Sequence, residues 1–185
     1  DKTSVDLGSK LIFKDDGPRL KSASLTDAVL TVDESFLGAA GATTSVALST
    51  LVNAIPVAAY GNDGMNAAEP ISYTLKSSGN SDLVDTLTGD AVLLKTLDNG
   101  KTVTGYITTD DGEVPVFTLT LNGDGEIELT QLRAVFHKDA TTQEEHSSPS
   151  NGSISLEITI TDGDGDTDKT SVDLGSKLIF KDDGP

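Results

Sequence analysis

Residues 154–167 read ISLEITITDGDGDT, and this stretch decides the fold class. Its aliphatic residues stand at every second position: Ile154, Leu156, Ile158 and Ile160. A period of two is typical of a strand that buries one face and leaves the other in water. The Asp/Gly run at 162–166 is then a tight turn, and a second apolar set follows within 168–180. We therefore expect two antiparallel strands joined by an acidic hairpin turn.

The same alternation recurs earlier in the chain, where residues 117–121 read FTLTL. Turn signals stand at 98–100 (DNG) and at 122–125 (NGDG), each between two apolar stretches. Further strands are expected near 25–32, 45–52, 70–77, 91–97, 101–109 and 126–136. No long segment has an apolar period of 3.6, although 45–55 could hold a short helical turn. Roughly eight strands joined by such turns indicate an all-β antiparallel sandwich.

The composition limits the classes of partner. The chain has 185 residues, with 30 Asp and Glu against 13 Lys and Arg, and a formal net charge of −17. This charge argues against nucleic acids and anionic membrane surfaces, both of which attract basic proteins. No apolar run approaches the length of a membrane span, so we expect no membrane insertion. The first residues do not resemble a signal peptide, and the absence of cysteine excludes disulfides.

An internal repeat sets the domain organisation. Residues 1–18, DKTSVDLGSKLIFKDDGP, recur without change at 168–185, an offset of 167 (168 minus 1). Such a copy indicates one full period of a tandem array plus an overhang, with a cloning duplication as the alternative. We expect 1–18 to be the terminal strand and linker of a preceding repeat, 19–180 to be one domain, and 181–185 to be the linker to the next.

The overhang raises a question of pairing, because a lone strand leaves its backbone groups without partners. Residues 1–13 could add to an edge of their own domain. Alternatively, they could dock on a neighbouring molecule, making a head-to-tail contact through the 1–18 overhang. The sequence leaves both arrangements open.

Acidic residues gather where the domain would meet its linkers. Calcium takes about six to eight oxygen ligands on flexible loops, and the turn at 162–166 offers alternate carboxylates separated by glycines. The flanking strands exclude an EF-hand, which needs helices. The alternative is a hairpin turn with solvated carboxylates, which is also the interpretation we favour for the acidic turn at 110–112.

Topology strengthens the calcium interpretation. If the strands alternate in direction and the chain enters and leaves at opposite ends, the turn at 162–166 lies beside the acidic pair at 15–16. At the opposite end, the acidic pair at 33–34 meets the pair at 182–183. Close carboxylates repel by about 1 kcal/mol per pair even in water, and a divalent ion would turn that repulsion into a clamp. Solvated surface charge is the alternative for each pair taken alone.

Four motifs carry a resemblance to a known family. The linker ends in DDGP, residues 30–36 read LTVDESF, residues 118–137 read TLTLNGDGEIELTQLRAVFH, and residues 153–168 read SISLEITITDGDGDTD. Together they resemble the tandem extender repeats (bacterial Ig-like or cadherin-like) of giant RTX adhesins, which Gram-negative bacteria secrete through type I systems. The resemblance covers residues 15–185, and VDESF with TQLRA is its most specific part.

The resemblance implies an Ig-like β-sandwich with Greek-key character, about seven to nine strands and calcium-bearing linkers. It implies a spacer on the bacterial cell surface that projects a ligand-binding region for adhesion and biofilm formation, with neighbouring identical repeats and calcium (Ca2+) as partners. It also implies calcium roles for nine acidic residues: Asp15, Asp16, Asp33, Glu34, Asp162, Asp164, Asp166, Asp182 and Asp183.

Catalysis is not expected. The two histidines, His137 and His146, stand in no metal or triad pattern, and we expect both at the exposed surface. No nucleophile elbow, phosphate loop or zincin motif is present. The alternative function is a module that itself binds a glycan, a peptide or ice. A hydroxyl face for such a ligand could come from Thr102, Thr104, Thr108, Thr118 and Thr120.

Overall fold

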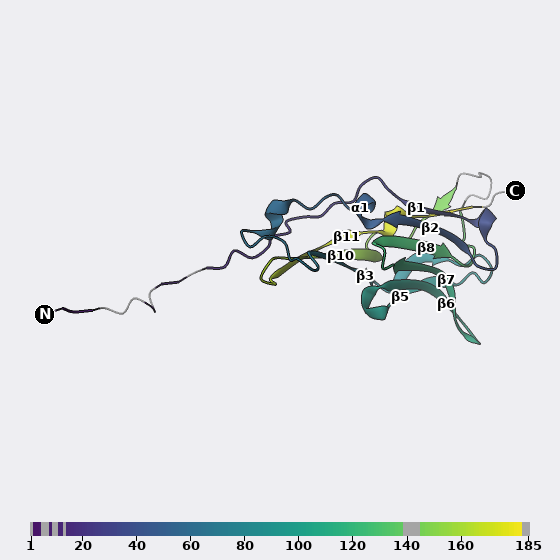
Figure 1. The fold of residues 1–185 in the computed structure, drawn as a ribbon. Helices are drawn as coiled ribbons and strands as arrows, with labels where there is room; N and C mark the ends of the chain where they lie inside the picture. Colours follow the sequence, from purple (N-terminus) through teal and green to yellow (C-terminus); the bar gives the residue numbers. More distant parts are fainter. Residues whose placement is uncertain (1, 5–7, 9–10, 13, 139–144, 183–185) are drawn as a thin grey trace.

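The structure, a computed structural model, describes residues 2–4, 8, 11–12, 14–138 and 145–182. These residues confirm an all-β sandwich (Figure 1). The strands are β1 (Leu30–Asp33), β2 (Ala42–Ala47), β3 (Ile71–Ser77), β4 (Asn80–Val84), β5 (Ala91–Leu97), β6 (Thr102–Thr109), β7 (Gly112–Leu121), β8 (Glu126–Gln131), β9 (His146–Ser147), β10 (Ile154–Thr161), β11 (Thr167–Asp173) and β12 (Leu178–Lys181). Between them lie one turn of α-helix, α1 (Leu48–Leu51), and the 3-10 turns η2 (Glu34–Phe36), η3 (Val57–Tyr60), η4 (Asp98–Gly100) and η5 (Gly175–Lys177).

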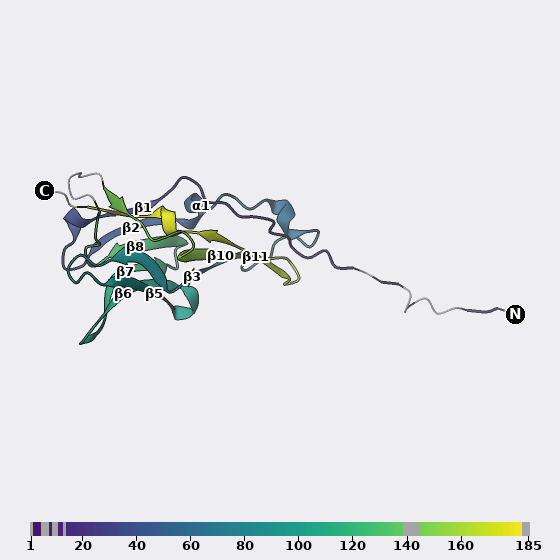
Figure 2. The same cartoon turned by 180° about the vertical axis from the view of Figure 1, so that it is seen from behind.

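Three sheets make two layers. The antiparallel six-stranded sheet, in the order β2-β8-β7-β6-β5-β4, faces two three-stranded sheets, β11-β10-β3 and β1-β12-β9 (Figures 1 and 2). The rings of Phe117 on β7 and Phe180 on β12 meet across the layers with centroids 5.2 Å apart. Aliphatic side chains fill the space around them, because each strand turns every second residue inward.

The predicted hairpin is present. All four aliphatic residues of β10 are fully buried: Ile154, Leu156, Ile158 and Ile160. β10 pairs antiparallel with β11 on one side and with β3 on the other. The turns at 98–100, 110–111 and 122–125 join successive strands of the six-stranded sheet, as predicted, and α1 is the short helical turn expected within 45–55.

The repeated segment forms two strands instead of one. β11 ends at Asp173, the 3-10 turn η5 follows at Gly175–Lys177, and β12 then joins a different sheet. There β12 pairs in parallel with β1, so that Leu30 lies opposite Leu178 and Asp33 opposite Lys181. Because the first and last strands run in the same direction, the end of β1 and the chain beyond β12 meet at one end of the sandwich.

The described residues contain twelve strands, more than the seven to nine expected. The split of the repeated segment accounts for one. β4 is another, and it has an irregular register around Asp82, whose φ of 62° breaks the strand alternation. β9 has only two residues, too few for a sequence period.

The overhang lies outside the sheets. Within residues 1–13, the described residues 2–4, 8, 11 and 12 are exposed and belong to no strand, and this segment extends away from the sandwich (Figure 1). Leu11 is 64% exposed, whereas its counterpart in the second copy, Leu178, is fully buried. Pairing with an edge of its own domain is therefore not seen in this part of the chain, and the head-to-tail contact stays a prediction.

Two further features bear on function. Of the five threonines considered for a hydroxyl face, only Thr108 is exposed, and Thr104 is buried. They therefore present no regular surface of hydroxyl groups. No helix within the described ranges is long and apolar enough to cross a membrane.

Candidate metal sites at the two ends of the sandwich

The linker is fixed to the sandwich at the end where the chain joins it, here called the leading end. Pro18 and Leu20 are buried there. The Arg19 amide donates to the carbonyl of Ala59 at 2.7 Å, and the Leu20 amide donates to Asp168 Oδ2 at 2.7 Å. These contacts fix the linker to η3 and to β11 from residue 18 onward.

Asp16 is held by the loop that follows η3. Asn62 Nδ2 donates to Asp16 Oδ2 at 2.6 Å. Gly61 has a φ of +71°, and a Cβ at this position would overlap Asp16 Oδ1 and crowd the Asp16 carbonyl. Only glycine combines this backbone conformation with so close an approach. The GNDG sequence at 61–64 therefore serves to dock the linker.

The acidic turn before β11 lies beside the docked linker. Asp162 is fully buried, and its Oδ1 accepts from the amides of Gly165 at 3.1 Å and Asp166 at 2.8 Å. Its Oδ2 is buried and has no hydrogen-bond partner. Oxygen atoms of Asp162, Asp164 and Asp166 lie within 4.8 Å of one another. This geometry leaves a buried anionic atom facing two more carboxylates.

A second acidic group shares Asp164 with the first. Oxygen atoms of Asp15, Asp63 and Asp164 also lie within 4.8 Å of one another, so the linker, the 61–64 loop and the β10–β11 turn converge. We call Asp15, Asp63, Asp162, Asp164 and Asp166 the leading-end cluster. Sequence analysis did not single out Asp63. The signal it offered was the turn chemistry of GNDG, which brings the loop against the acidic turn.

Neighbouring carboxyl groups raise the pKa of two aspartates in this cluster. The pKa of Asp164 is raised, first by side-chain contact with the Asp162 carboxyl group and then by desolvation and the charge of Asp15. The pKa of Asp166 is raised, first by side-chain contact with the Asp15 carboxyl group and then by its charge. Crowded carboxylates repel one another when all are ionised, and a cation can relieve this repulsion.

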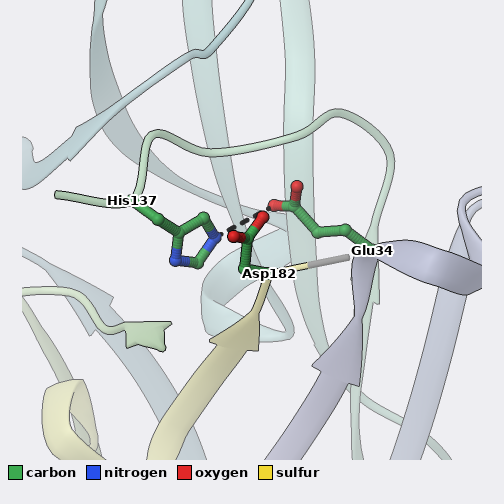
Figure 3. Close-up of side chains that lie close together, drawn as sticks. All are labelled: Glu34, His137 and Asp182. Atoms are coloured by element: carbon green, nitrogen blue, oxygen red, sulfur yellow. Dashed lines mark hydrogen bonds and ion pairs between the residues drawn. The ribbon is translucent and has the colours of Figure 1, made fainter. Parts of the chain in front are cut away.

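The opposite, trailing end holds a different group. Glu34, His137 and Asp182 point toward one another (Figure 3), with one ligand atom from each within 4.8 Å of the others. Glu34 is 9% exposed and His137 is 8% exposed, whereas Asp182 is half-buried. This trailing-end cluster lies where the end of β1 meets the chain beyond β12. It therefore differs from the leading-end cluster by an imidazole and by deeper burial.

Glu34 is the centre of the trailing-end cluster. Its Oε1 accepts from Gln131 Nε2 at 2.7 Å and from the Val135 amide at 2.8 Å, and it lies 3.4 Å from His137 Nε2. Burial raises the pKa of Glu34, against the lowering effect of these hydrogen bonds and of His137. A carboxyl group in this position binds a cation or a proton more readily than an exposed one.

The position of His137 corrects a sequence-based prediction. We expected His137 to be exposed, whereas it is buried; His146 on β9 is exposed as predicted. The strand expected at 126–136 ends at Gln131, but the alternation of burial continues beyond it: Val135 and His137 are buried, and Phe136 and Lys138 are exposed. The fold places His137 beside Glu34 because the segment after β8 pairs with the end of β4, and its Val135 amide donates to Glu34.

The structure brings together most, but not all, of the predicted ligands. Asp15, Asp162, Asp164 and Asp166 meet at the leading end, and Glu34 and Asp182 meet at the trailing end. Asp16 lies next to the leading-end cluster and is bound by Asn62. Asp33 belongs to neither cluster: its Oδ1 accepts from the Ser35 amide at 2.9 Å, and its pKa is lowered first by the Ser35 side chain and then by this amide. Asp183 lies outside the described residues.

The two most specific motifs of the resemblance, VDESF and TQLRA, are in direct contact. VDESF supplies Glu34 and TQLRA supplies Gln131, which donates to it. TQLRA also supplies Arg133, whose Nε and Nη2 donate to the two oxygens of buried Asp85 at 2.7 and 2.8 Å. Much of the specificity of these motifs is therefore explained by polar packing near the trailing end.

Comparison with known proteins gives one match. A family model described as Domain of unknown function (DUF5801) matches residues 29–175, most of the sandwich from β1 to the start of η5. No curated protein and no solved structure gives a significant match.

Proposed function

The chain belongs to the DUF5801 family of domains, and on that premise we propose that it is a non-catalytic extender repeat of a long bacterial surface adhesin. In this proposal calcium bound at the junctions between repeats stiffens the array, and the stiff array projects a distal ligand-binding region for adhesion and biofilm formation. Export through a type I system and an extracellular location belong to the same proposal, which takes them from the resemblance to RTX adhesin repeats.

One observation carries the proposal: the repeat makes Asp15 and Asp182 the same position, since 15 plus 167 is 182. Asp15 lies in the leading-end cluster, and Asp182 lies in the trailing-end cluster. In a tandem array, a single linker aspartate would therefore stand between the trailing end of one repeat and the leading end of the next. Ions bound at the two clusters would hold the same few linker residues from both sides, and a rigid junction requires this.

The leading-end cluster supports calcium by its chemistry. All five side chains offer oxygen, the ligand atom that calcium prefers, and they come from a linker, a loop and a turn. The buried Oδ2 of Asp162 has no protein donor, so a cation there would satisfy an atom whose burial otherwise destabilises the fold by about 1–3 kcal/mol. An ion that joins Asp15 to the other carboxylates would also tie the linker to the domain.

The shape supports a spacer. The chain joins the sandwich at one end and leaves β12 at the other (Figures 1 and 2). β7, with ten residues, is about 33 Å long at 3.3 Å per residue, so each repeat with its linker adds on the order of 40 Å. An array of such units gains reach in proportion to its length only if the junctions do not bend freely.

A thermal melt of the 185-residue chain tests the calcium step. An ion at a hundred times its Kd stabilises the fold by about 2.7 kcal/mol, which corresponds to a rise in Tm of about 5–11 °C for a domain of this size. We expect this rise with calcium and no comparable rise with magnesium or with chelator. Equal melting curves in all three conditions would refute the calcium clamp.

Small-angle X-ray scattering tests the spacer step on a chain of two repeats joined through the repeated segment. We expect a maximum dimension close to twice that of one unit in calcium, and a shorter, broader distribution of distances in chelator. A two-repeat chain that is equally compact in both conditions would rule out calcium-dependent stiffening, even if each repeat binds the ion.

A further inference from the structure

We propose that the trailing-end cluster of Glu34, His137 and Asp182 is a site for a transition-metal ion of the Zn2+ class, separate from the calcium proposed at the leading end. This inference goes beyond the proposed function and does not depend on it, since it concerns the opposite end of the sandwich and a different class of ion. It changes the ligand class expected for Glu34 and Asp182.

The ligand types favour such an ion. Calcium and magnesium take oxygen ligands almost exclusively, whereas imidazole nitrogen is a preferred ligand of zinc, copper and nickel. One imidazole and two carboxylates make a donor set whose charge balances a divalent ion. The neutral complex that results is compatible with the burial of Glu34 and His137.

The contact of His137 Nδ1 with Ser147 leaves the other ring nitrogen, Nε2, available to an ion. Ser147 Oγ lies 3.2 Å from the carbonyl of Phe136 and 3.3 Å from His137 Nδ1. Ser147 has one hydroxyl proton, and the carbonyl can only accept, so the tautomer of His137 that carries its proton on Nδ1 satisfies both contacts. In the neutral ring Nε2 is then an acceptor, and it faces Glu34 Oε1, which is also an acceptor. A divalent ion between these two atoms would be bound by both.

The distance between these two acceptors fits a metal better than a hydrogen bond. Nε2 and Oε1 are 3.4 Å apart, longer than the usual range for N–H···O bonds. Two ligands at about 2.05 Å from a tetrahedral zinc ion are separated by about 3.4 Å. The third ligand atom, from Asp182, lies within 4.8 Å of both, so it could reach the same ion with a small movement.

An independent observation points the same way. Gln131 is fully buried, and the amide that donates to Glu34 through Nε2 has an Oε1 with no hydrogen-bond partner. A zinc site with three protein ligands keeps a fourth position for water, which is a proton donor. The buried Gln131 oxygen lacks a donor, and Gln131 contacts the cluster directly through Glu34. Asp182 is half-buried, which leaves the site open to ions from solvent.

Titration of the 185-residue chain with Co2+ and with Zn2+, in excess calcium, tests the proposal. Tetrahedral Co2+ has strong visible absorption, so it reports the geometry of the site, and calorimetry gives the affinity for Zn2+. We expect one ion per chain, not displaced by calcium. In His137→Gln we expect the Zn2+ affinity to fall by at least about 100-fold, given that loss of an outer-shell partner alone costs 10- to 100-fold.

His146→Gln is the matched control, because it removes the other, exposed histidine and should leave the affinity unchanged. NMR of the histidine rings in the unsubstituted chain makes the test independent of how well the variant folds: Zn2+ should shift the ring signals of His137 and not those of His146. The proposal is overturned if Zn2+ does not bind, if calcium competes with it on equal terms, or if His137→Gln binds as tightly as the unsubstituted chain.

Discussion

Asp162→Asn should make the domain more stable without calcium and less responsive to it. The asparagine Oδ1 can accept the same two amide bonds, from Gly165 and Asp166, that Asp162 Oδ1 accepts. Its Nδ2 replaces the buried, unpartnered Oδ2 and becomes a donor toward Asp164 and Asp166. The substitution thus keeps the shape of the turn and replaces one buried hydrogen-bond acceptor by a donor.

The magnitude follows from the geometry. Two carboxylates at 4.8 Å repel by about 1 kcal/mol in a water-like dielectric, and Asp162 has two such neighbours. Removing both repulsions should raise the free energy of unfolding in chelator by about 1–2 kcal/mol. For a domain of this size the corresponding rise in Tm is roughly 2–8 °C. In saturating calcium the variant loses a ligand, so its further gain should be less than half of that of the unsubstituted chain.

The assay is a set of four melts: variant and unsubstituted chain, each with calcium and with chelator. Asp110→Asn is the control, because it removes the same charge from an exposed turn that joins neither metal-compatible group of the described residues. A variant that is less stable in chelator and gains as much from calcium as the unsubstituted chain would refute the reasoning. Asp162 would then serve only to hold the turn.

Three further predictions concern packing, linker docking and pH. Gly105→Ala should lower Tm by about 2–12 °C, because the added Cβ would overlap the buried ring of Phe117 and overpacking costs about 1–3 kcal/mol; an unchanged melt would mean that the ring can move aside. Gly61→Ala should displace Asp16, and should therefore weaken calcium binding and speed hydrogen exchange at the Arg19 amide. The control is Gly64→Ala, which has a similar φ of +73° but open space around it and should show only the cost of backbone strain. Equal effects of the two substitutions would exclude a role for the Asp16 contact. Asp85→Asn should destabilise the domain by about 3 kcal/mol at neutral pH, since it leaves Arg133 without its charge partner. Burial raises the pKa of Asp85, but hydrogen bonds from Arg133 and Thr88 lower it by more, so this carboxylate stabilises the fold above the unfolded pKa of about 3.9 and the contribution is lost as the pH falls through the folded pKa. The difference in stability between Asp85→Asn and the unsubstituted chain should therefore shrink below about pH 4, and a constant difference in urea melts across pH 3–7 would contradict this assignment.

The sequence predicted the features that depend on local chemistry. The alternation in 154–160 predicted a half-buried strand, and the glycine turns predicted hairpins, because strand period and turn conformation are properties of a few adjacent residues. The meeting of Asp15 with the turn at 162–166, and of Glu34 with Asp182, followed from the direction of the strands alone.

What the sequence did not predict depends on contacts between distant segments. Asp63 stands in a loop and His137 lies beyond the end of β8, and only the fold brings them beside Asp164 and Glu34. The repeated segment is the clearest case, since Leu11 and Leu178 have the same neighbours in sequence, yet one is exposed and the other is buried. Burial here is decided by which sheet edges are within reach, and a local pattern holds no information about that.

The parallel pairing of β1 with β12 has a consequence for a chain under tension. A pull along the array acts toward the leading end on the segment that precedes β1 and toward the trailing end on the chain that follows β12. Because the two strands run in the same direction, that load slides one along the other. The register pairs, from Leu30 with Leu178 to Asp33 with Lys181, therefore carry the force together and do not open one at a time. A strand pair loaded in shear yields at a higher force than one that is peeled, so in the array that we propose the load would be resisted first by these few hydrogen bonds and by the buried Phe180 beside them.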